Sequence, residues 1–90
     1  MGRESIRITL PDGSFIEVLI KEVQPDKWRP HGVRYRLAWV QNEKCRVLFD
    51  NHHGKGDHYH LDGIESPYKF KTVERLWLDF QAEVERLRGT

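Results

Sequence analysis

Hydrophobic and polar residues alternate in the first part of the chain, and this alternation predicts a β-hairpin. Ile6, Ile8 and Leu10 are separated by polar residues, and a second run of β-branched and aromatic residues extends from 15 to 23. Pro11-Asp12-Gly13 stands between the two runs. Proline presets the φ angle of a turn and glycine accepts a positive φ, so this sequence is typical of a turn between paired strands.

The same two-residue period predicts three further strands, over residues 33–39, 45–49 and 57–62. Cys45 falls on the apolar side of its strand, so we expect it to be buried. Residues 24–32 contain two prolines and no periodic pattern, and we expect them to form a loop.

From residue 73 the apolar spacing changes to that of one helical face. Thr72 suits the N-cap and Gly89 suits the end, so we predict a helix from about residue 73 to residue 88. The residues expected on its buried face are Val73, Leu76, Trp77, Phe80, Val84 and Leu87.

These elements predict an α+β fold: an antiparallel meander sheet of about four or five strands with one C-terminal amphipathic helix packed on one face. We expect a single domain over residues 1–90, with strands from about residue 4 to residue 62, because no repeat, low-complexity tract or linker divides the chain. One helix covers only one face of such a sheet, so the other face must be solvated or bind something.

Alternation also predicts what that other face carries. If Tyr59 and Leu61 point toward the helix, their neighbours in the strand point away from it. The arginines that alternate with apolar residues point the same way. The residues expected to share this face are His58, His60, Asp62, Arg34, Arg36 and Arg46.

Composition adds a basic middle segment and a cellular setting. The net charge is only +1, yet residues 27–46 hold six basic residues and a single acidic one. Cys45 is the only cysteine, which excludes an intramolecular disulfide and fits a reducing compartment. No apolar run approaches the length of a membrane span, so we expect a cytoplasmic protein without membrane contact.

Residues 49–60 concentrate the chemistry of the chain. They include four of its five histidines, two aspartates and a lysine between two glycines. Imidazole changes charge near neutral pH and therefore serves proton transfer, phosphate binding or metal ligation. Glycines beside a lysine let a bulky anion approach the backbone.

A basic face with imidazoles suits a phosphodiester, and we interpret it as a site for RNA cleavage. One imidazole of His58 and His60 would take the 2′-hydroxyl proton and the other would protonate the leaving oxygen. Lys55 would stabilise charge on phosphorus, and Asp57 or Asp50 would orient an imidazole. No metal or other cofactor is needed. The strand would be held by Arg34, Arg36 and Arg46, with Trp28 stacking on a base or covering the sheet edge.

Four other interpretations stay open from the residues alone. The cluster can be solvated turn chemistry, or the face can bind nucleic acid or a partner without reacting. Alternatively, His58 and His60 can bind a metal with Asp50, His52 or Asp62 as a further ligand. The uncovered face can also serve as a homodimer interface.

The second half of the chain resembles the TumE family of small bacterial toxins. The resemblance rests on Tyr35-Arg36-Leu37-Ala38-Trp39-Val40, Phe49-Asp50-Asn51, Gly54-Lys55-Gly56-Asp57-His58-Tyr59-His60, Glu65-Ser66-Pro67-Tyr68-Lys69-Phe70 and Leu78-Asp79-Phe80. It implies a cytoplasmic toxin with a cognate antitoxin, often one with a helix-turn-helix DNA-binding domain.

The positions that match the family motif are Asp50, Asn51, Gly54, Lys55, Gly56, Asp57, His58 and His60, followed by Tyr68 and Phe70 as structural aromatics. The resemblance carries no reaction with it. The ribonuclease hypothesis therefore depends on the residue chemistry and on analogy with other toxins of this broad type.

Overall fold

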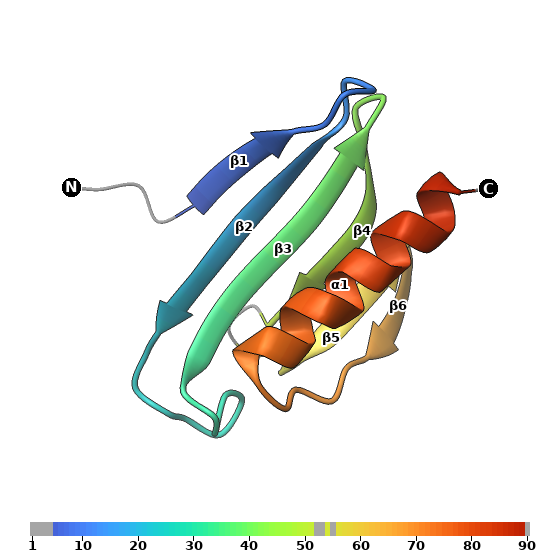
Figure 1. Ribbon diagram of the computed structural model, residues 1–90. Helices are drawn as coiled ribbons and strands as arrows, with labels where there is room; N and C mark the ends of the chain where they lie inside the picture. Colours follow the sequence, from blue (N-terminus) through green and yellow to red (C-terminus); the bar gives the residue numbers. More distant parts are fainter. Residues whose placement is uncertain (1–4, 52–53, 55, 90) are drawn as a thin grey trace.

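A computed structural model describes residues 5–51, 54 and 56–89, and in it six strands precede one helix (Figure 1). Each strand pairs antiparallel with the next, in the spatial order β1-β2-β3-β4-β5-β6. The predicted α+β meander is confirmed, but the predicted number of strands was too low. The elements are β1 (Ser5–Thr9), β2 (Phe15–Glu22), β3 (Val33–Gln41), β4 (Lys44–Asp50), β5 (His58–Leu61), β6 (Ile64–Pro67) and α1 (Val73–Arg88).

The strand that the sequence pattern missed is β6. It follows β5 after a two-residue turn in which Asp62 and Gly63 both have positive φ, 49° and 86°. Asp-Gly is a favoured pair for such a turn, because its twist matches that of the flanking strands. The strand itself is four residues long and carries little apolar alternation, so the period gave no signal for it.

A β-bulge in the β3–β4 hairpin changes the side of the sheet to which the first side chains of β4 point. Trp39 lies opposite Val47, whereas Val40 lies opposite Cys45, so one residue of β4 is extra at this point. Cys45 is consequently exposed, and the prediction that it is buried was wrong. Arg46 is the residue left between the two paired positions.

Helix α1 follows its predicted bounds. Its first turn is capped by the Thr72 hydroxyl, which accepts a hydrogen bond from the Arg75 backbone N–H at 3.0 Å. It buries Leu76, Phe80 and Val84 against a cluster on the sheet that includes Trp39, Val47, Phe49, Tyr35 and Leu37. Among the described residues, no helix has the length and apolar character needed to cross a bilayer.

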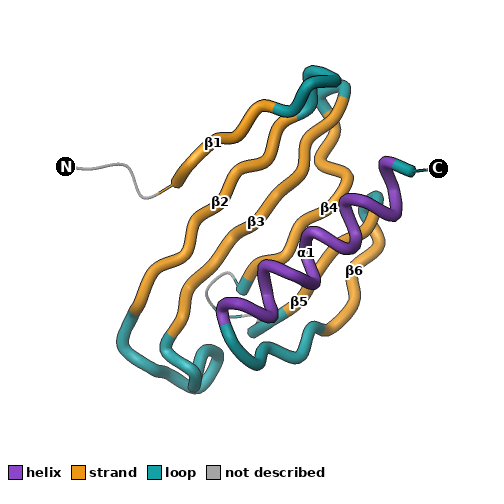
Figure 2. The backbone as a smooth tube through the Cα atoms, viewed as in Figure 1, coloured by secondary structure: helices purple, strands orange, loops and turns teal. Residues whose placement is uncertain are grey.

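The helix lies over the β4 side of the sheet and leaves the β1 side bare (Figure 2). On the helix side, Ile6 and Ile8 are therefore 64% and 43% exposed. They line an apolar groove of about 370 Å³ together with Val18, Ile20, Val73 and Trp77. The opposite side of the sheet, called the open face below, carries no helix formed by the described residues (Figure 1).

Candidate functional site

Two cross-strand rows on the open face bring the predicted site residues together. In the first row Arg36 lies opposite Asp50, which lies opposite His58. In the second row His60 lies beside Glu65. Directly paired residues project to the same side of a sheet. Their neighbours Leu37, Phe49 and Tyr59 belong to the helix-side core or pack against it, so these rows project to the open face.

His58 is nearly buried and held from both ring nitrogens. Its Nδ1 lies 3.1 Å from the Gly56 carbonyl oxygen, which can only accept, so Nδ1 carries a hydrogen. Its Nε2 lies 2.6 Å from Oδ1 of Asp50.

The contact between Asp50 and His58 is close but not aligned as a hydrogen bond. The Oδ1 atom of Asp50 is buried and has no hydrogen-bond partner among the described residues. The carboxylate oxygen and the ring are therefore in close contact without a hydrogen bond between them.

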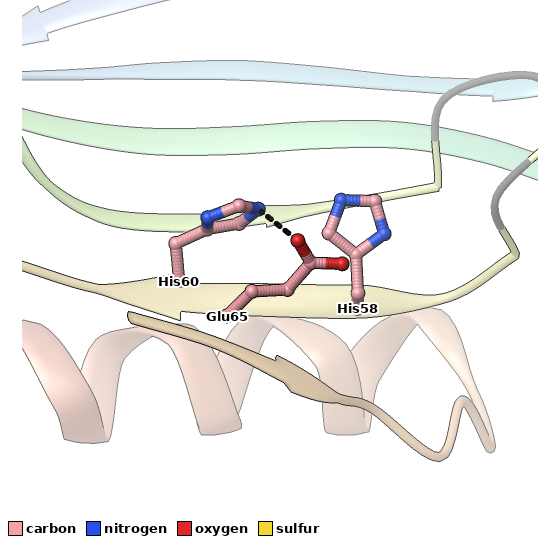
Figure 3. A group of neighbouring side chains, drawn as sticks. All are labelled: His58, His60 and Glu65. Carbon is pink, nitrogen blue, oxygen red and sulfur yellow. Dashed lines mark ion pairs between the residues drawn. The ribbon is translucent and has the colours of Figure 1, made fainter. Parts of the chain in front are cut away.

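His60 has a looser environment than His58. Its ring lies edge-on to the His58 ring, with 5.1 Å between centroids and 69° between planes. Its Nε2 is 4.0 Å from Oε1 of Glu65, which reaches across from β6 (Figure 3). Sequence reasoning did not select Glu65, because it missed β6. The Asp62-Gly63 turn was the signal that would have located it.

Two of the three predicted phosphate-binding arginines lie on the open face. Arg36 is half exposed and lies 3.7 Å from Glu17 on β2. Arg34 is exposed and forms no ion pair within the described part of the chain. Both guanidinium groups are thus open to solvent on the side that carries the imidazoles.

Arg46 does not share this face, and that prediction was wrong. The bulge turns its side chain toward Trp39, with 5.4 Å between the guanidinium carbon and the ring centroid. It forms an ion pair with Asp62, which raises the pKa of Arg46 and lowers the pKa of Asp62. Asp62, offered above as a metal ligand, is therefore engaged at the turn after β5.

Asp57 points away from the catalytic candidates and into the helix side. Its carboxylate accepts a hydrogen bond from the Tyr35 hydroxyl at 2.7 Å and another from the Asn51 amide at 3.2 Å. Both of its oxygens lie 3.1 Å from Nε2 of His31. Of the two carboxylates expected to orient an imidazole, Asp50 stands beside His58 and Asp57 holds His31.

His31 was not selected from the sequence, because it stands in a loop without periodic pattern. Its Nδ1 accepts a hydrogen bond from the Val33 N–H at 3.1 Å, so Nε2 is the nitrogen that donates to Asp57. The ring packs at 4.0 Å from the Phe70 ring, which in turn stacks on Tyr35 at 5.6 Å. Burial and the bond to Asp57 raise the pKa of the Tyr35 phenol.

Asn51 extends the pairing of β3 and β4 beyond the end of β4. Its side-chain oxygen accepts from the Tyr35 N–H at 3.1 Å, and its amide donates to the Val33 carbonyl at 2.7 Å. Asn51 and Asp57 are therefore the fixed ends of the loop between β4 and β5. The family-motif aromatics are structural as well, since Phe70 covers His31 and the Tyr68 hydroxyl donates to Asp79 at 2.6 Å.

The loop between Asn51 and Asp57 holds the remaining predicted residues. Gly54 and Gly56 have positive φ, 89° and 74°. A Cβ on Gly56 would lie 3.8 Å from the Trp28 carbonyl oxygen, so the loop with Trp28 lies beside this one. Lys55, expected to stabilise phosphorus, lies outside the described residues, as do His52 and His53.

This fold and this face define a small α+β protein that presents imidazole, carboxylate and guanidinium groups on a bare sheet surface. The chain belongs to the TumE toxin family, since the family model described as Toxin TumE matches residues 2–88. The match thus includes β1 and β2, beyond the part on which the sequence resemblance rested. Searches of curated proteins and of solved structures found no match. Family membership makes the protein the toxin component of a toxin–antitoxin system, with an antitoxin as its partner.

Proposed function

We propose that this toxin is an endoribonuclease that cleaves RNA in the cytoplasm without a metal ion. The observation that carries the proposal is the group formed by His58, His60, Asp50 and Arg36 on the open face. Two imidazoles with 5.1 Å between ring centroids can reach two oxygens of one phosphate. Arg36, on the same face and two strands from His58, can bind a neighbouring phosphate of the same strand.

The environments of the two histidines suggest separate roles. His58, which lies beside the carboxylate of Asp50, is assigned as the general acid. His60, more exposed and only 4.0 Å from Glu65, is suited to act as the general base. The base takes the 2′-hydroxyl proton as the 2′-oxygen bonds to phosphorus. The acid then protonates the 5′-oxygen as its bond to phosphorus breaks, leaving a 2′,3′-cyclic phosphate and a 5′-hydroxyl.

Lys55, which lies outside the described residues, is proposed to stabilise charge on phosphorus. Asp57 is not given a chemical role. It fixes the loop, and Asp50 takes the place next to the imidazole.

The test is cleavage of a single-stranded RNA by the purified protein in the presence of a strong chelator. Wild type is expected to give products with 5′-hydroxyl ends, and a His58→Ala/His60→Ala variant is expected to lose at least about a hundredfold in rate. The same sequence as 2′-O-methyl RNA should resist cleavage, because the nucleophile is blocked.

Equal cleavage by the wild type and the double variant would remove the catalytic assignment. Cleavage that disappears in chelator would remove the metal-independent scheme. Circular dichroism of the double variant must match that of the wild type, so that lost activity is not lost fold.

A non-enzymatic function is the second candidate, favoured by the exposed guanidinium of Arg34, which has no ion pair within the described chain. In that case the same face binds RNA and blocks its use without cutting it. Binding with no product in any metal or chelator condition would establish this alternative over the first.

A further inference from the structure

His58, His60 and Glu65 form a group of metal-ligand type on the open face. Their nearest donor atoms, two imidazole nitrogens and a carboxylate oxygen, all lie within 4.8 Å of one another. Figure 3 shows the Glu65 carboxylate reaching between the two rings from the neighbouring strand. Two imidazoles and one carboxylate, with room for a further ligand, are a donor set used for zinc and similar divalent transition metals.

His58 already has the surroundings of a metal-binding imidazole. Its Nδ1 donates to the Gly56 carbonyl oxygen at 3.1 Å, which fixes the ring orientation and leaves Nε2 as the ligand atom. A ligating histidine usually makes such a bond with its second nitrogen. The side chain is 7% exposed, so this ligand is held in place before any ion arrives.

Asp50 supplies an independent reason to place a cation there. Its buried Oδ1 lies 2.6 Å from Nε2 of His58 and has no hydrogen-bond partner among the described residues. An anionic oxygen in that state is stabilised by any cation that binds beside it. It can also serve as a fourth ligand after a shift, since a zinc bound to both atoms would separate them by about 3.3 Å.

The other two ligands must move, and their exposure allows it. Donor atoms around a tetrahedral zinc lie about 3.3 Å apart, closer than the present limit of the group. The side chains of His60 and Glu65 are 27% and 44% exposed, so side-chain rotation can bring them inward without disturbing the core.

We propose that His58, His60 and Glu65, with Asp50 beside them, bind a divalent transition metal of the zinc class, and that the bound metal inhibits the toxin. The inhibitory part rests on the proposed function, because a metal on the imidazole nitrogens removes them from acid–base chemistry. The binding part depends only on the donor set.

The experiment titrates Zn²⁺ into metal-free wild type by calorimetry and measures RNA cleavage at each zinc concentration. One equivalent is expected to bind and to slow cleavage. Glu65→Gln should weaken zinc binding by at least about tenfold and should need correspondingly more zinc for inhibition. Glu85→Gln, an identical change on the exposed side of α1, should behave as wild type does.

Equal zinc affinity in wild type and Glu65→Gln overturns the site. Tight binding with unchanged cleavage overturns the inhibition. Tight binding with faster cleavage also overturns it and supports a metal-dependent reaction. If the protein cuts no RNA under any condition, the proposed function fails and the inhibition falls with it, while the calorimetric comparison still decides whether the metal site exists.

Discussion

The Asp57 carboxylate accepts hydrogen bonds from side chains of three separate segments. Tyr35 comes from β3, Asn51 follows β4, and His31 stands in the loop before β3. The side chain is 16% exposed, so water can replace few of these bonds. A buried group with several partners is costly to change, because each partner loses its acceptor as well.

Asp57→Asn is therefore expected to lower the free energy of unfolding by about 1–3 kcal/mol, since an amide offers one acceptor where the carboxylate offered two and adds a competing donor. Urea denaturation followed by fluorescence measures the change. Asp62→Asn is the matched control, because it removes an exposed carboxylate paired with Arg46. It should not measurably change the free energy of unfolding. If Asp57→Asn lowers the free energy of unfolding no more than Asp62→Asn does, the hydrogen bonds of Asp57 do not contribute more to stability than an exposed ion pair.

At the scale of elements, the sequence specified most of the sheet and missed the features without a period. Alternation located β1 to β5 and placed the histidines of β5 opposite its core residues, because one buried face imposes a two-residue repeat. It failed at Cys45 and Arg46, where a bulge adds one residue to β4 and changes the face of the sheet to which the first residues of the strand point. It also failed at β6, which is short and mostly exposed.

The candidate site could be predicted only where its residues lie on patterned strands. Alternation assigns His58, His60, Arg34 and Arg36 to one face, because each alternates with an apolar residue. His31 could not be paired with Asp57, since that contact joins two loops whose relative position depends on the folded sheet.

The β5–β6 hairpin depends on the backbone of Gly63, which has a φ of +86°. Apart from Gly63 and its two chain neighbours, no atom of the described residues lies within 4 Å of a Cβ built there, so a side chain at this position meets no steric obstacle among them. Gly63→Ala should cost about 1 kcal/mol through backbone strain alone, whereas Gly63→Asn should cost clearly less, because asparagine tolerates the left-handed region. Thermal unfolding of both variants measures this. The same midpoint in both would mean that conformational strain does not limit the hairpin.

Arginine side chains lie on both sides of the molecule. The open face carries Arg34 and Arg36 near the imidazoles, whereas Arg75 and Arg86 lie on α1 and pair with Asp79 and Glu83 of the same helix. An RNA strand bound at the imidazoles must therefore meet the first pair of arginines and not the second. Because the net charge of the chain is only +1, the proposed RNA surface depends on this local distribution of arginines.

Arg34→Ala/Arg36→Ala is expected to weaken binding of a 2′-O-methyl RNA, which cannot be cleaved, by at least about tenfold, and to reduce the slope of log affinity against log salt by roughly 1.4, or about 0.7 for each lost phosphate contact. Arg75→Ala/Arg86→Ala removes the same charge from the helix side and should change neither quantity measurably. Fluorescence anisotropy over a salt series measures both. Equal weakening by the two double variants would contradict the open face as the RNA surface, because only a diffuse attraction to net charge treats the two sides alike.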